Sequence, residues 1–497
     1  MCQLTLRRAY ILRSQETGEL DSLSHHDMAP IGLAILGAGI FAKEAHLPAL
    51  AVHGSEKSTV NAVYSRSKSS ASSLAEQVKE RLGNAPARRE NSTLSLSLSH
   101  HDMAPIGLAI LGAGIFAKEA HLPALAVHGS EKSTVKAVYS RSKSSASSLA
   151  EQVKERLGNA PAVYSEDGAS EGGLDALLAR PDIQAVIVVL PLTQQPDIVL
   201  KALAAGKNVL SEKPVAKDVK TGIELIEKWE KEYKPKGLIW RVAENFEVEP
   251  GVLEAAQRIK AGAIGKVRLF NFSMVFSVDK DNKYYQTSWR TIPDYQGGFL
   301  LDAGVHTNAA LRRVLGSSFP LDTAKVTGFA SLTRDYLAPH DTFQAVIQAA
   351  PTSSGEHPPQ GISEMSCAVK PGFGRYVLTV TGTEGNLTLE SVHKPVKEAD
   401  LALARASAFN SGNNERPVVP YWKTTITGPD GSKTEEFDRI SSGVYEELGN
   451  FLNALSGKDD GNGEPRDALL DVALIQAYLT SQGNAIDIKK LLSTGSA

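Results

Sequence analysis

Ala109-Ile110-Leu111-Gly112-Ala113-Gly114-Ile115-Phe116-Ala117 is the stretch that decides the fold of this chain. The apolar run 106–111 predicts a buried strand, the pattern Gly-x-Gly-x-x-Ala follows it, and residues 121–125 open a helix. This order predicts a dinucleotide-binding turn. Gly112 permits the tight turn, Gly114 lets the backbone approach a pyrophosphate, and small Ala117 lets helix and strand pack closely. Free N–H groups at the helix N-terminus would face the phosphates.

One stretch of this sequence occurs twice. Residues 22–87 and 97–162 are identical after a shift of 75 positions, except that Asn61 corresponds to Lys136. The repeated unit is too small to bury a core of its own. Because the second copy runs on into further strands and helices, we expect it to be the working one. Residues 1–102 then form an extension with a duplicated partial segment, from a tandem duplication or a mis-assembled gene, and Met103 is the natural start.

Composition excludes several classes of protein. The 497 residues leave room for two or three domains, and the net charge of -3 gives no reason to expect a nucleic-acid partner. Cys2 and Cys367 are the only cysteines, which excludes a disulfide scaffold and a cysteine-based zinc site. The histidines are not spaced as ligands, so we expect no metal. No apolar run is long enough to span a bilayer, and we expect a cytoplasmic protein without a membrane partner.

The end of the predicted strand 134–139 indicates which cofactor binds. NAD-binding sheets usually place an acidic residue here for the ribose 2′-hydroxyl, whereas this chain has Ser140-Arg141-Ser142-Lys143. Arg141 and Lys143 would attract a 2′-phosphate, so NADP(H) is favoured, with NAD(H) as the alternative. Both cations could also be ordinary solvated charges that open the next helix.

The rest of the chain falls into two halves. Up to residue 243, apolar strands alternate with helices over short connections, which predicts a doubly wound parallel sheet for residues 103–243. Residues 244–497 predict a second α/β domain, in which alternating strands separated by turn signals form an open antiparallel sheet.

Three residues carry the expected chemistry. Lys213 lies just beyond a sheet strand, where a lysine can hold a substrate hydroxyl or share its proton. Asp302 and His306 are i and i+4, so on a helix they share one face. We expect Lys213 and His306 to form an acid/base pair, with Asp302 orienting the histidine or binding a hydroxyl. The alternatives are a surface salt bridge at Lys213 and a helix N-cap with a satisfied histidine.

Four blocks of sequence resemble the glucose–fructose oxidoreductase / inositol dehydrogenase / MocA family, and within it a fungal subgroup of NADP-dependent oxidoreductases. The blocks are the glycine turn with 121–123, residues 204–214, residues 242–245, and Trp289-Arg290 leading to 297–306. The resemblance implies a Rossmann domain, a C-terminal domain whose open sheet often makes oligomer contacts, and a nicotinamide in the cleft between them. It also gives Lys213 and the Asp302/His306 pair catalytic or substrate-binding roles. Where many members have a histidine, this chain has Gln195.

These observations together predict an oxidoreductase that moves hydride between NADP(H) and a carbonyl or secondary alcohol of a small molecule such as a sugar or polyol. A non-catalytic NADP-binding transcriptional regulator is the alternative. The expected cofactor-binding residues are Gly112, Gly114, Ile115, Phe116, Ser140, Arg141, Lys143, Pro191, Glu212 and Lys213. The expected substrate contacts are Asn245, Trp289 and Arg290. We also expect a homo-oligomer formed through the C-terminal sheet.

Overall fold

The computed structural model describes residues 31–36, 58–64, 87–88, 105–168, 172–350, 358–406 and 417–496. The chain divides into two units, Met1–Met103 and Ala104–Ala497. In the first unit, the described residues form a parallel sheet of β1 (Ile31–Leu36), β2 (Ser58–Tyr64) and β3 (Ala87–Arg88). The pairing of β1 with β2 has the same register, with the same irregularity, as the corresponding pair in the second unit. The duplicated text therefore forms the same strand pair twice.

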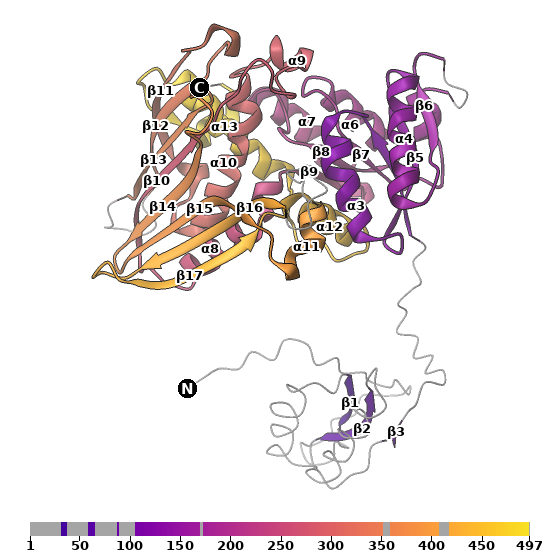
Figure 1. Ribbon diagram of the computed structural model, residues 1–497, viewed down its shortest axis with the longest axis horizontal. Coiled ribbons are helices and arrows are strands. Elements are labelled where there is room, and N and C mark those ends of the chain that lie inside the picture. Colours follow the sequence, from indigo (N-terminus) through magenta and orange to yellow (C-terminus); the bar gives the residue numbers. More distant parts are fainter. Residues whose placement is uncertain are drawn as a thin grey trace, which may run out of the picture. The chain divides into compact units, whose positions relative to one another are not determined.

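A parallel sheet carries the glycine turn of the second unit (Figure 1). Among the described residues its strand order is β6 (Ala162–Ser165), β5 (Ser133–Ser140), β4 (Ile106–Leu111), β7 (Ala185–Val188), β8 (Asn208–Glu212) and β9 (Trp240–Ala243). Strands β5 and β6, which follow β4 in the chain, lie on one side of it, and strands β7, β8 and β9 lie on the other side. The direction of winding thus reverses at β4, and the glycine turn lies at its carboxyl end, where such sheets bind ligands.

Helices connect these strands, and each begins or ends where the sequence indicates. They are α3 (Leu122–His128), α4 (Lys143–Leu157), α5 (Leu174–Leu178), α6 (Gln195–Ala204) and α7 (Val219–Glu232). Ser142 caps α4 by accepting from the Ser145 N–H, and Gly158 ends it in a left-handed conformation. Asp218 caps α7 in the same way through the Thr221 N–H. The predicted doubly wound domain is confirmed.

The second sheet is mixed, not purely antiparallel as the sequence predicts. Among the described residues its order is β17 (Lys433–Ile440), β16 (Val418–Thr427), β15 (Asn386–Pro395), β14 (Arg375–Gly382), β10 (Val267–Val275), β13 (Gln360–Ser366), β12 (Thr342–Gln348), β11 (Lys325–Ser331) and β18 (Ile486–Asp487). β10 pairs with β13 in parallel, and the other pairs are antiparallel. A crossover through α10 (Phe299–Leu315) separates β10 from the meander β11–β12–β13, whose last strand then lies beside β10 in the same direction.

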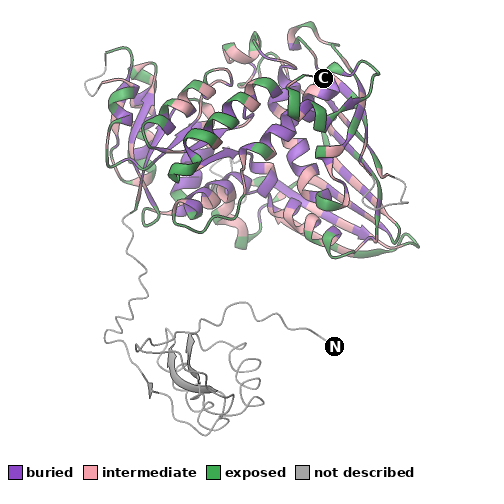
Figure 2. Cartoon of the chain, turned by 180° about the vertical axis from the view of Figure 1, so that it is seen from behind, coloured by how far each residue is buried: buried purple, intermediate pink, exposed green. Residues whose placement is uncertain are grey.

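Helices α8 (Pro250–Lys260) and α13 (Pro465–Thr480) pack against α10, and α12 (Gly443–Leu455) packs against α3. The remaining described helices of this half are α9 (Ser288–Thr291), α11 (Leu401–Ala406) and α14 (Ile488–Thr494). Buried residues follow the strands of both sheets and run along α10 and α13 (Figure 2). α10 therefore lies inside the unit and holds its side chains in fixed places. Among the helices that the structure describes, none is long and apolar enough to cross a membrane.

Candidate active site

The two glycines of the turn have different surroundings. Gly112 has φ +115°, and a Cβ there would lie 2.0 Å from the Val189 carbonyl oxygen. A Cβ on Gly114 would meet no atom within 4 Å. Both residues line a cavity of about 610 Å³. Gly112 is thus required by the protein's own packing, whereas Gly114 keeps open a space that a pyrophosphate can occupy.

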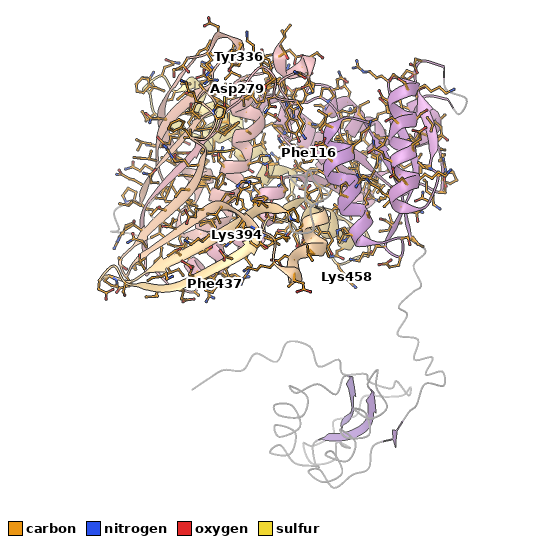
Figure 3. All side chains as sticks on the ribbon, viewed as in Figure 1. Phe116, Asp279, Tyr336, Lys394, Phe437 and Lys458 are labelled. Atoms are coloured by element: carbon orange, nitrogen blue, oxygen red, sulfur yellow. The ribbon has the colours of Figure 1, made fainter. Side chains whose placement is uncertain are left out.

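This cavity brings together most of the residues predicted for the site. Its lining includes the following residues from both halves of the unit: Gly112, Gly114, Ile115, Phe116, Ser140, Arg141, Pro191, Glu212, Lys213, Asn245, Trp289, Arg290, Asp302 and His306. Phe116 lies in the middle of the unit in Figure 3. Lys143 is not among the lining residues, and its backbone N–H donates to Asp167 Oδ1 at 2.6 Å.

Lys213 and Arg290 share one carboxylate. Lys213 Nζ donates to the backbone carbonyl of Asp302 at 2.7 Å and to Asp302 Oδ1 at 3.1 Å, and Arg290 Nε donates to Asp302 Oδ2 at 2.7 Å. Burial alone would raise the pKa of Asp302, but the charges of Lys213 and Arg290 hold it well below its ordinary value. Since an ammonium group has three donors, one N–H of Lys213 remains for a ligand in the cavity.

His306 is held by a different carboxylate from the one the sequence suggests. Its Nδ1 lies 2.6 Å from Glu244 Oε1, and its ring stacks on Phe246 with centroids 4.4 Å apart. Asp302, four residues earlier on α10, is occupied by the two cations. Of the two roles expected for Asp302, the structure shows no contact for orienting His306, because sharing a helix face does not decide which partner a side chain takes; the role in binding a hydroxyl stays a prediction. Glu244 leaves Nε2 as the free ring nitrogen on a residue that lines the cavity.

The end of β5 forms the part of the cavity that would face the adenosine ribose. Ser140, Arg141 and Ser145 line it. The nearby Glu166 is directed elsewhere, since its Oε1 accepts from the Tyr139 hydroxyl at 2.9 Å and from the Leu174 N–H at 3.2 Å. Arg141, the residue that directly follows β5, is thus the charged residue at this end of the cavity.

An acidic layer lies beside the cavity. His121 Nε2 is 2.6 Å from Glu212 Oε1, and a carboxylate oxygen of Glu447 lies within 4.8 Å of both groups. Burial and the carboxylates of Glu212, Glu244 and Glu249 raise the pKa of Glu447 well above its ordinary value. His121 Nδ1 and both carboxylate oxygens of Glu447 are buried and have no hydrogen-bond partner among the described residues. The absence of a metal site stays a prediction.

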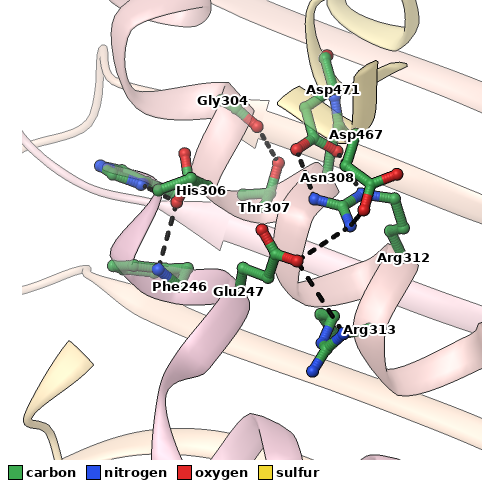
Figure 4. A network of polar contacts seen from close by, with 11 residues as sticks. Phe246, Glu247, Gly304, His306, Thr307, Asn308, Arg312, Arg313, Asp467 and Asp471 are labelled. Carbon is green, nitrogen blue, oxygen red and sulfur yellow. Dashed lines mark hydrogen bonds and ion pairs between the residues drawn. The ribbon is translucent and has the colours of Figure 1, made fainter. Parts of the chain in front are cut away.

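An ion-pair network fixes the helix that carries Asp302 and His306. Arg312 of α10 donates to both carboxylate oxygens of Asp471, at 3.2 and 3.0 Å, and also contacts Glu247 and Asp467 (Figure 4). Burial raises the pKa of Asp471 to about 7, although Arg312 acts against this rise. His306 and Phe246 lie side by side at the other end of this network in Figure 4. The network thereby ties α10 to α13 and to the segment after β9.

Sequence reasoning missed two features of this site. The pairing of Glu244 with His306 joins residues 62 positions apart, for which no local pattern exists. Gln195 lines the cavity, is 3% exposed, and its Oε1 has no hydrogen-bond partner in the described part of the chain. Its position on α6 after the Pro191 turn was the available signal. Its free oxygen can accept a hydrogen bond from a ligand.

A Rossmann domain joined to a mixed-sheet domain, with titratable residues gathered at the glycine turn, defines an NAD(P)-binding oxidoreductase. The sequence profile described as "Oxidoreductase family, NAD-binding Rossmann fold" matches residues 106–235, and the profile described as "GFO/IDH/MocA C-terminal domain" matches residues 252–388. Dehydrogenase FPY6 of Fusarium mangiferae is 40% identical over 380 residues, which are 76% of this chain and 96% of the relative. The chain belongs to the GFO/IDH/MocA family, and the resemblance inferred from the sequence is confirmed.

The chain is also similar to two further proteins, one by its structure and one by its sequence. The solved structure of an oxidoreductase from Thermotoga maritima is 29% identical, with a TM-score of 0.61, and the match covers 78% of this chain and 100% of that one. The scyllo-inositol 2-dehydrogenase (NAD(+)) of Bacillus subtilis is 29% identical over 277 residues, which are 55% of this chain and 70% of the relative. The Rossmann profile begins at residue 106, within the second copy of the repeat.

Proposed function

We propose that this chain is an NADP(H)-dependent oxidoreductase that interconverts a carbonyl and a secondary alcohol on a small molecule such as a sugar or polyol. The observation that carries the proposal is that Lys213, Asp302 and His306 line the same cavity as the glycine turn. The open space at Gly114 fits a pyrophosphate, and Arg141 suits a 2′-phosphate. When bound, the nicotinamide supplies or accepts the hydride.

The protein's own residues position the substrate and move the proton. In the reducing direction, the carbonyl carbon gains a hydride and its oxygen gains a proton. The free N–H of Lys213 donates to that oxygen, with Asp302 and Arg290 fixing the ammonium group. His306 Nε2 delivers the proton, and in the oxidising direction it accepts the proton from the hydroxyl. Trp289, Arg290 and Asn245 would enclose the rest of the substrate.

Cofactor choice rests on Arg141. The Bacillus subtilis relative is named for NAD(+), so membership of the family does not decide the cofactor. An arginine at the end of β5 pairs with a phosphate and gives nothing comparable to a ribose hydroxyl, which favours NADP(H).

A carbonyl panel with NADPH tests the proposal. The purified chain should oxidise NADPH with at least one sugar or keto-polyol. Lys213→Ala should abolish turnover, and His306→Gln should abolish turnover while still binding NADPH. A chain that binds NADPH tightly but turns over no member of the panel would favour the alternative, a non-catalytic regulator. The retained Lys213, Asp302 and His306 favour the enzyme, because a sensor has no need of a proton-transfer set.

The face of the second sheet offers a place for a second copy. Leu269, Phe329, Val346 and Ile362 are 49%, 65%, 49% and 45% exposed, and Val346 pairs directly with Ile362 across β12 and β13. Apolar side chains gathered on a sheet face are typical of interfaces. We propose a homo-oligomer through this face. Val346→Glu should lower the mass measured by light scattering.

A further inference from the structure

We propose that Glu244 is a positioning residue that fixes the tautomer and the direction of His306, so that Nε2 is the nitrogen that exchanges the proton. This inference rests on the proposed function and names a residue whose role in it has not been assigned. Glu244 touches neither cofactor nor substrate in this account, because it is not among the residues that line the cavity. It acts through the histidine.

The contact between the two residues is short and buried. Glu244 is 3% exposed, and its Oε1 lies 2.6 Å from His306 Nδ1. The same Oε1 accepts the Phe246 N–H at 3.1 Å, which ties the carboxylate to the backbone of the short 3-10 helix η4 (Asn245–Val248). An ionised Glu244 can only accept, and His306 Nδ1 then carries the hydrogen. The neutral ring then presents an unprotonated Nε2, and the charged ring presents an Nε2–H.

Phe246 restricts the remaining freedom of the ring. It stacks on His306 with an interplanar angle of 20°, and it also packs edge-on against Tyr376 and Trp422. Rotation of the imidazole would lose this stack as well as the hydrogen bond to Glu244. Segment 244–246 therefore holds both the chemical form and the orientation of a residue on α10.

The charge of Glu244 also acts on the proton affinity of His306. On the cavity side, the charged groups of the neighbouring elements are Glu212, Lys213, Arg290 and Asp302, and Arg141 lies at the adenosine end of the same cavity. Behind Glu244 lie Glu447 on α12, Asp471 on α13, Tyr376 on β14 and Glu249 after η4. Glu244 is the carboxylate in direct contact with the ring, so its negative charge stabilises the imidazolium. Replacing it with a neutral group should make His306 easier to deprotonate.

Glu244→Gln in the full chain tests the inference, since it keeps the shape and removes the charge. We expect kcat for NADPH-dependent reduction to fall about 100-fold with little change in KM, because Gln allows either tautomer. The pH profile of kcat/KM should differ between Glu244→Gln and the natural chain, because the charge beside His306 Nδ1 is removed. NADPH affinity should stay within twofold. Glu249→Gln is the matched control, since it changes a buried carboxyl nearby that bonds to Ser441 and Ser442 instead of His306.

A second readout separates this inference from the proposed function. The ring nitrogens of His306 can be observed by NMR in protein labelled with 15N-histidine, with the signals assigned by their loss in His306→Gln. We expect a single Nδ1-protonated tautomer in the natural chain and a mixture of tautomers in Glu244→Gln. An unchanged tautomer in Glu244→Gln would overturn the inference, even if the chain reduces carbonyls. If the natural chain is inactive on the whole panel but shows the expected tautomer, the result would contradict the proposed function and leave the inference about Glu244 in place. If Glu244→Gln unfolds, Glu244→Asp replaces it in the test. Glu244→Asp keeps the charge, so its kcat/KM profile should have its limb at nearly the same pH as the natural chain, while kcat falls. A limb at a different pH in Glu244→Asp would count against the positioning role of Glu244.

Discussion

At the scale of single residues, two carboxylates of the site bind different partners. Asp302 neutralises Lys213 and Arg290, while Glu244 holds His306. Each titratable group thus has its own counter-charge, and neither pairing competes with the other. The division explains how a cation for binding oxygen and a histidine for moving a proton can lie in the same cavity.

Arg141→Ala should separate the two cofactors. We expect the Kd for NADPH to rise about tenfold or more, since a charge-assisted pair with the 2′-phosphate is lost, and the Kd for NADH to change little. Fluorescence titration measures both values. Lys143→Ala is the control, because Lys143 does not line the cavity, and an equal loss in both variants would contradict the role given to Arg141.

Glu249 should make the protein less stable as the pH rises. Burial raises its pKa to about 7, against hydrogen bonds from Ser441 and Ser442 that lower it. Between the unfolded pKa of 4.5 and the folded pKa of about 7, Glu249 holds a proton in the folded chain and has lost it in the unfolded chain. The stabilisation from this proton is therefore fully present below pH 4.5 and is lost as the pH rises to about 7. Between pH 4.5 and 8, the natural chain should lose up to about 3 kcal/mol more free energy of unfolding than Glu249→Gln. Urea unfolding at these pH values measures the free energy of unfolding of both proteins. If that free energy changes with pH equally in both, the prediction is wrong.

At the scale of elements, the turn between β4 and the following helix gives a matched pair of variants. Gly112→Ala should destabilise the fold, because its Cβ would lie 2.0 Å from the Val189 oxygen and its φ is +115°. Gly114→Ala should leave the melting temperature within a few degrees, since its Cβ meets nothing within 4 Å, yet weaken NADPH binding at least about tenfold by filling the space for the pyrophosphate. Thermal unfolding and titration distinguish the two effects. Loss of stability in Gly114→Ala, or none in Gly112→Ala, would show that the glycines have other roles.

The same scale shows what the sequence could predict. Apolar runs and glycine punctuation located β4 to β9 and their helices, because parallel strands buried on both faces leave a strong local signal. The second sheet was less predictable. β17 (Lys433–Ile440) is mostly polar and therefore gives little apolar signal. The parallel pairing of β10 with β13 depends on a crossover that no local pattern specifies. Likewise, Lys213 and His306 could be predicted from local motifs, whereas the contact of His306 with Glu244 could not.

At the scale of the whole molecule, the two copies of the repeated sequence belong to different sheets. The first copy forms β1, β2 and β3 within the unit Met1–Met103. The second copy contributes β4, β5 and the start of β6 to the sheet that carries Lys213, and the family profile begins at residue 106. The account therefore places the cofactor site wholly in Ala104–Ala497. The first copy has an identical glycine turn, but its remaining structure lies outside the described residues.

The most direct test of the central claim is to titrate NADPH and NADH into the full chain and into a shortened form that begins at Met103. The account predicts that both proteins bind one NADPH per chain with the same Kd, and that both bind NADH at least about tenfold more weakly, since the unit from Ala104 holds the glycine turn and Arg141. A shortened form that does not fold, or that binds neither cofactor while the full chain does, would contradict the claim and would assign the first copy to the working site.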